Sequence, residues 1–180
     1  YYFVLAASYS TLLEEISGND FHAIWEGDAN LILANAPLYM TADTQTLLET
    51  MLGKCKYPVQ RVTGENQFDF IDWREPDVYA VLPFDSLTPN LKVIDIDQNN
   101  ILDKGFDSEK YPLKIQFSLE YKDPADTSDD QIITLSNRNN SELSRLLMTG
   151  TTALVRRLGV LMETKGMTYP VKDIDPWLKA

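Results

Sequence analysis

The chain has only one histidine, His22, and one cysteine, Cys55, among its 180 residues. A single residue of each type cannot form a zinc site of several cysteine and histidine ligands, and a lone cysteine forms no internal disulfide. The glycine patterns of a nucleophile elbow, a Walker loop and a dinucleotide-binding turn are also absent. We expect Cys55 to be a buried or half-buried thiol and His22 to be structural. Any chemistry would therefore need carboxylates, lysines, hydroxyls or a bound ion.

Positive charge is also scarce, because 16 lysines and arginines face 27 aspartates and glutamates, which gives a net charge of −11. Such a surface repels phosphate backbones, and the only adjacent basic pair is Arg156 and Arg157, so nucleic acid is not expected as a partner. No apolar run approaches the roughly 20 residues of a membrane span. Residues 2–7 could be the remnant of a signal peptide, but a first strand or helix is favoured, and we expect a cytoplasmic location.

Several short apolar runs predict strands. Those at 29–34, 67–72, 77–82 and 91–96 are bounded by turn residues. The clearest strand is predicted at 113–121, where Leu113, Ile115 and Phe117 alternate with polar residues, and 131–135 would pair with it. Because this alternation leaves one face in water, we expect a mostly antiparallel or mixed sheet.

Capping patterns predict three helices. Thr11 and Glu14 have the spacing of a capping box, and a second short helix is expected from Thr41 or Asp43 to Gly53. The third helix is expected to be long and amphipathic, because leucines recur at helical spacing from residue 143 to 161 between an Asn139 cap and Gly166.

These elements predict an α+β fold with a long C-terminal helix and two shorter helices. We expect residues 1–166 to form a single domain and residues 167–180 to form a C-terminal tail or docking arm.

One acidic stretch has part of the pattern of a calcium loop. Asp95, Asp97, Asn99 and Asp103 occupy relative positions 1, 3, 5 and 9, where oxygen ligands converge on a hard cation. Position 12 is Phe106 where such a loop needs a glutamate. A turn rich in Asp and Asn between strands is therefore favoured, and calcium-stabilised binding is an alternative.

A second pattern resembles metal-dependent nucleases of the PD-(D/E)xK class. Asp77 follows a proline, and Glu120 and Lys122 flank a tyrosine in a predicted strand. In that class the acidic residues hold magnesium and the lysine lies beside the attacking water. Charged residues are expected anyway on the wet face of such a strand, and the net charge opposes a nucleic-acid substrate. A magnesium-dependent phosphodiesterase is therefore an alternative.

The favoured interpretation is a non-enzymatic acidic module that binds another protein or copies of itself, with no cofactor. It would be a subunit of a larger assembly or an inhibitor of the immunity type. Buried aromatic or arginine anchors usually carry the affinity of such proteins. The candidate contact residues are Trp177, Leu178, Tyr169, Arg156 and Arg157, with Trp25 and Trp73 as further aromatic candidates.

Overall fold

The computed structural model describes residues 1–28, 33, 36–63, 68, 77–117, 136–144 and 157–169. The chain divides into two compact units, Tyr1–Leu143 and Ser144–Ala180, and each is described by itself. The predicted boundary between residues 166 and 167 falls inside the second unit and stays a prediction. Within the described ranges, no helix is long and apolar enough to cross a membrane.

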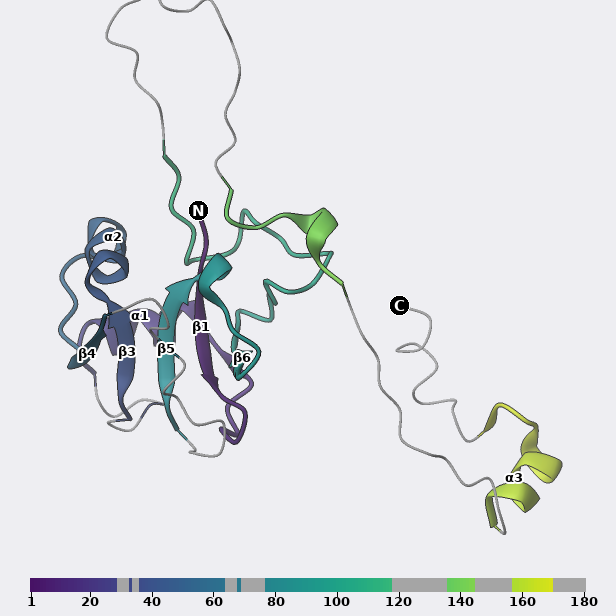
Figure 1. The fold of residues 1–180 in the computed structure, drawn as a ribbon. Coiled ribbons are helices and arrows are strands. Elements are labelled where there is room, and N and C mark those ends of the chain that lie inside the picture. Colours follow the sequence, from purple (N-terminus) through teal and green to yellow (C-terminus); the bar gives the residue numbers. More distant parts are fainter. Residues whose placement is uncertain are drawn as a thin grey trace, which may run out of the picture. The chain divides into compact units, whose positions relative to one another are not determined.

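The first unit is built on a mixed sheet of five described strands in the order β4-β3-β5-β1-β6 (Figure 1). Strand β3 pairs in parallel with β4 and with β5, whereas β1 pairs antiparallel with β5 and with β6. The prediction of an α+β fold with a mixed sheet is confirmed. The strands are β1 (Phe3–Ser8), β3 (Leu38–Thr41), β4 (Val59–Val62), β5 (Tyr79–Pro83) and β6 (Leu91–Val93).

The centre of the core is formed by β1 and β5. All six residues of β1 are buried, as are Tyr79–Leu82 of β5, because β1 lies between two neighbours in the sheet. A strand covered on both faces has a continuous apolar sequence rather than an alternating one. The strand expected at 77–82 is therefore present as β5, and the first element, expected to be a strand or a helix, is the strand β1.

The strand predicted at 91–96 is divided between two sheets. After β6, the N–H of Ile94 donates to Leu5 O at 2.9 Å, and β7 (Asp95–Ile96) then pairs in parallel with β2 (Glu15–Ile16). Ile94 and Ile96 are fully buried, so this change of sheet takes place over the core.

The first helix, α1 (Gly18–Trp25), has its cap at Ser17, six residues after the predicted cap at Thr11. That prediction is wrong because the Thr11 hydroxyl is used elsewhere: it bonds Ser8 Oγ at 3.0 Å and accepts from the Asp77 N–H at 3.0 Å. The cap is Ser17, whose Oγ accepts from the backbone of the first turn. Helix α1 lies behind the sheet in the view of Figure 1.

The second helix, α2 (Ala42–Leu52), is confirmed with the predicted cap and end. Thr41 Oγ1 accepts from the Thr44 N–H at 3.0 Å, and Gly53 ends the helix with a φ of 78°, which favours glycine. Thr44 and Leu48 are buried, and the helix packs on β3 and β5.

In the described part of the strand predicted at 113–121, residues 113–117, the structure shows a short pairing with the start of the chain. Lys114 forms an isolated bridge with Tyr2, and the Phe3 N–H donates to Leu113 O at 2.9 Å. Leu113 is buried, but Phe117 is 58% exposed, so the predicted alternation ends before it. Residues 118–121 and 131–135 lie outside the described residues, as do the strands predicted at 29–34 and 67–72, except for Leu33 and Phe68, which are buried.

The prediction of a long C-terminal helix is wrong. Asn139 does cap a turn, because its Oδ1 accepts from the Ser141 N–H at 3.1 Å. The turn is a 3-10 helix, η3 (Asn140–Glu142), and the chain becomes extended again at Leu143. No residue of η3 is buried, so this turn lacks the buried face that stabilises longer helices in proteins. In the second unit, α3 (Arg157–Lys165) is a separate short helix.

Gly166 ends α3 as predicted. Its φ is 99°, and its N–H donates to Met162 O at 2.9 Å.

Candidate functional site

Most of the predicted contact residues of the C-terminal region lie outside the described residues, namely Arg156, Trp177 and Leu178. Arg157 is the first residue of α3. Tyr169 lies just after this helix and contacts it: Lys165 Nζ donates to the Tyr169 hydroxyl at 3.1 Å and lies 4.6 Å from the ring centroid. Tyr169 therefore packs against its own helix end.

Two of the three tryptophans, Trp73 and Trp177, lie outside the described residues. Trp25 is 1% exposed, and its indole N–H donates to Gly53 O at 2.8 Å, which ties the end of α1 to the end of α2. Trp25 therefore completes the core and is not available as an interface anchor.

Of the predicted phosphodiesterase residues, the structure describes Asp77, whereas Glu120 and Lys122 lie outside the described residues. Asp77 has a φ of 58°, which is strained for a residue with a side chain. Its carboxylate lies beside the Tyr79 hydroxyl, whose pKa is raised to about 12 by burial and by the charge of Asp77 and its hydrogen bond. The grouping of the three residues stays a prediction.

The residues of the predicted calcium loop form other contacts. Asp97 Oδ1 accepts from the Gly18 N–H at 2.9 Å, so its carboxylate holds the start of α1. The Asn99 amide donates to Asp107 O at 2.7 Å and accepts from the Asp107 N–H at 3.1 Å. In the part of the chain that the structure describes, no three His, Cys, Asp or Glu residues are placed to hold a metal ion. The described geometry gives calcium binding no support.

Carboxylates gather instead around the small β2–β7 sheet. Glu15 lies directly opposite Asp95 in the parallel register. Burial raises the pKa of Asp95, and the negative charges of Asp103, Glu15 and Glu14 raise it further. Lys92 offsets part of this charge, because its Nζ donates to Glu14 Oε1 at 2.6 Å and also to Thr11 O.

Two large apolar side chains project from the loop that leads into β2. Leu12 is 92% exposed and Tyr9 is 54% exposed. We call this loop and its neighbouring carboxylates the acidic loop surface; it consists of Tyr9, Leu12, Glu14, Glu15 and Asp95. Sequence reasoning missed it because the spacing of Thr11 and Glu14 predicts a helix start here, not an exposed loop.

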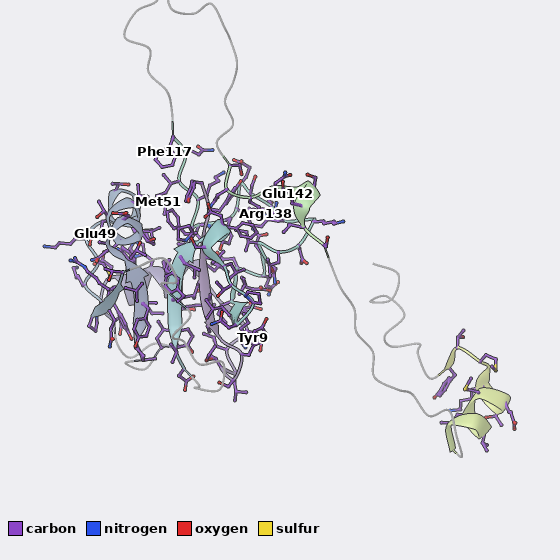
Figure 2. The ribbon with its side chains drawn as sticks, viewed as in Figure 1. Tyr9, Glu49, Met51, Phe117, Arg138 and Glu142 are labelled. Atoms are coloured by element: carbon purple, nitrogen blue, oxygen red, sulfur yellow. The ribbon has the colours of Figure 1, made fainter. Side chains whose placement is uncertain are left out.

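Figure 2 shows that the exposed apolar residues are not all at one place. Tyr9 lies at the end of the sheet where β1 stops, whereas Met51 and Phe117 lie near the other end. Phe117 makes an edge contact with the Tyr1 ring at 6.5 Å. The acidic loop surface is thus separate from the second exposed apolar region.

A pocket of about 310 Å³ lies beside the first turn of α1, and we call it the α1 pocket. Its ionisable lining residues are Asp97 and His22, and His22 is exposed rather than the structural residue that the sequence predicted. The absence of a side chain at Gly18 gives Asp97 room at the helix start, since a Cβ there would lie 2.8 Å from Asp97 Oδ2. The remaining lining residues are Gly18, Asn19, Phe21, Leu52, Pro112 and Leu113.

The lone thiol belongs to neither site. Cys55 is half-buried, as expected, and burial raises the pKa of its thiol. A raised pKa lowers the thiolate fraction at neutral pH and hence the reactivity. Nothing in its surroundings points to a catalytic role.

Comparison with protein-family models, with curated proteins and with solved structures finds no match to this chain. The function must therefore be argued from the acidic loop surface and the α1 pocket themselves.

Proposed function

We propose that this chain is a non-enzymatic acidic protein-binding module, acting as a subunit of a larger assembly or as an inhibitor of a basic partner. The observation that carries the proposal is the acidic loop surface, where the almost fully exposed Leu12 lies in the same loop as Glu14 and Glu15. In an isolated protein, an apolar side chain exposed to this degree contributes little hydrophobic stabilisation, because its surface stays in contact with water.

The composition of this surface supports a protein partner. Protein interfaces combine a few apolar or aromatic anchors with a polar rim that excludes water. Leu12 and Tyr9 supply the apolar part, and Glu14 and Glu15, both exposed, supply the rim. The partner surface would present an apolar recess for Leu12 and basic residues around it.

Charge favours a basic partner over a second copy of this chain. With a net charge of −11, two copies repel each other, and the carboxylates around Asp95 would meet the same carboxylates across a two-fold interface. A basic partner would instead neutralise charges that now repel one another, which also speeds its association at low salt.

The C-terminal residues predicted from the sequence remain a second contact region in this proposal. Trp177 and Leu178 would dock on the partner, with Arg156 and Arg157 beside them as further contact residues. Tyr169 would support the end of α3, in keeping with its contact with Lys165. Removing residues 167–180 is expected to weaken the complex without abolishing it.

Native mass spectrometry of the protein purified from its source tests the proposal. We expect a stoichiometric complex that Leu12→Glu disrupts, because a charge at the anchor position cannot enter an apolar recess. Leu102→Glu is the matched control, since Leu102 is also an exposed leucine but lies outside the acidic loop surface. A protein that stays monomeric would contradict the proposal. So would a complex that Leu12→Glu weakens no more than Leu102→Glu does.

A further inference from the structure

The α1 pocket places one carboxylate beside apolar walls. Asp97 comes from the turn after β7, Phe21 from α1 and Leu52 from the last turn of α2, while Pro112 and Leu113 come from the segment that pairs with β1. Four segments that are distant in the sequence thus meet around one opening. Its volume of about 310 Å³ is at the lower end of the range of small-ligand sites.

The position of Asp97 in this pocket is held at a conformational cost. Asp97 and Gln98 have φ angles of 53° and 59°, a conformation that side-chain-bearing residues rarely adopt. The Gly18 N–H donates to Asp97 Oδ1 and so supports the turn, and a Cβ at residue 18 would crowd Asp97 Oδ2 at 2.8 Å. The carboxylate is therefore fixed in place before any ligand arrives.

The start of a helix usually attracts anions, but two of the first N–H groups of α1 already have acceptors. The Gly18 N–H donates to Asp97 and the Asp20 N–H donates to Ser17 Oγ at 3.0 Å. An anion in the pocket would also meet the Asp97 carboxylate and the field of a chain with a net charge of −11. The polar end of the pocket is suited to a cation.

We infer that the α1 pocket receives a basic side chain of the protein partner, with its cationic group at Asp97 and its aliphatic stem against Leu52, Pro112 and Leu113. This inference rests on the proposed function, because it names the anchor that the basic partner would insert. Arginine and lysine both have the required form, since each carries a charged head on an apolar stem. Asn19 adds an amide at the rim that can bond to the partner backbone.

The test is a titration of the ¹⁵N-labelled full chain with blocked arginine (N-acetyl-arginine amide), followed by amide chemical shifts. Blocked citrulline is the matched ligand, because it has nearly the same shape without the charge. We expect saturable shifts at Gly18, His22 and Leu113 with arginine and at least about tenfold weaker binding of citrulline, since a charge-assisted hydrogen bond is lost. Equal binding of the two ligands, or shifts confined to Glu14 and Glu15, would overturn the inference.

A pair of variants tests the role of the carboxylate. Asp97→Asn keeps an oxygen that can accept from the Gly18 N–H, so the turn can be retained while the charge is lost. We expect it to weaken arginine binding about tenfold. Asp43→Asn removes the same charge from the first turn of α2, at the far end of the helix from Leu52, and should change binding less than about twofold. Equal effects of the two variants would show that only net charge matters and would overturn the inference.

The two proposals can fail separately. If blocked arginine does not bind but Leu12→Glu still disrupts the complex, the α1 pocket inference fails and the acidic loop surface stands. If arginine binds through Asp97 but the purified protein is strictly monomeric, the proposed function fails and the pocket remains a site for free cationic ligands. The arginine and citrulline comparison on the unmodified chain is decisive even if Asp97→Asn does not fold.

Discussion

Thr41 and Asn139 each cap a first turn through a side-chain oxygen, but the segments that follow them differ in length and burial. After Thr41, α2 runs for 11 residues and buries Thr44 and Leu48 against the sheet. After Asn139, η3 runs for three residues and buries none. The local signals are alike, so the difference comes from what lies underneath each segment.

This comparison separates two roles that a helical pattern combines. A cap satisfies the first N–H groups and so decides where a helix can begin. Growth beyond the first turn in a protein depends mainly on burying one face, because nucleation is costly and propensity alone is weak. Leu48 supplies that buried face in α2, and no described residue supplies it in η3.

The largest expected effect is therefore the removal of this burial. Leu48→Ala should lower the free energy of unfolding by about 2–5 kcal/mol, since Leu48 is fully buried and its loss leaves a cavity. Urea denaturation followed by circular dichroism measures it. Leu12→Ala is the control and should change stability by less than about 0.5 kcal/mol, because Leu12 is exposed. Similar losses in both variants would refute the burial argument.

The segment around η3 is attached by hydrogen bonds rather than by burial. The Asn137 side-chain amide makes two hydrogen bonds with the Tyr2 backbone, accepting from its N–H and donating to its carbonyl, each at 2.8 Å. These bonds resemble the backbone pairing of a neighbouring strand. Arg138 donates to Ile101 O and Asp103 O at 2.7 Å each and lies over the Phe106 ring. Figure 2 places Arg138 and Glu142 on this segment.

Asn137→Ala should accordingly lower the free energy of unfolding by about 1–3 kcal/mol, because two hydrogen bonds are lost. Asn140→Ala is the matched control, since Asn140 is exposed and makes only a long bond of 3.4 Å to Lys104 O. It should cost less than about 0.5 kcal/mol. Hydrogen exchange of the Tyr2 amide offers a local readout, and its protection should fall in the first variant only.

Much of the fold could be predicted where local pattern and burial agree. The runs in β1 and β5 are apolar without interruption and are buried on both faces, and α2 has its cap, its apolar face and its ending glycine in register. The α+β class and the mixed sheet follow from these elements. Each could be recognised from a few adjacent residues.

The features that could not be predicted from the sequence depend on contacts between distant residues. Thr11 has the spacing of a cap, but its hydroxyl bonds Ser8 and accepts from Asp77, 66 positions away. The sequence favours a turn rich in Asp and Asn at Asp97, but the hydrogen bond from the Gly18 N–H to Asp97 Oδ1 joins residues 79 positions apart. The α1 pocket arises from such pairings, and the acidic loop surface gains Asp95 through one of them.

The capping signals themselves can be compared directly. Thr41→Ala should lower the free energy of unfolding by about 1 kcal/mol, because the Thr44 N–H loses its acceptor at the start of a packed helix. Asn139→Ala should have a smaller effect, since its turn is exposed and supports no buried face. Chemical denaturation of both variants checks this order. An equal or larger loss for Asn139→Ala would mean that caps outweigh burial in this chain.

The smallest expected effect is a pH dependence with the sign set by Asp95. Its pKa is raised in the folded chain by burial and by Asp103, Glu15 and Glu14. As the pH rises above the ordinary value of 3.8, the unfolded chain loses this proton first, so stability falls until the pH passes the folded pKa. Asp95→Asn should therefore be more stable than the wild type at pH 7, with the difference vanishing near pH 3.

Asp107, 12 residues after Asp95, should give a pH dependence of stability with the opposite sign. A hydrogen bond from Lys110 and one from the Glu109 N–H lower the pKa of Asp107, so its ionised form stabilises the fold and this contribution is lost as the pH falls. Asp107→Asn should be less stable than the wild type at pH 7. Thermal unfolding of both variants between pH 3 and pH 7 measures the two trends. If both variants were destabilised at pH 7, the carboxylates around Asp95 would not repel one another, and the electrostatic argument for a basic partner would lose its basis.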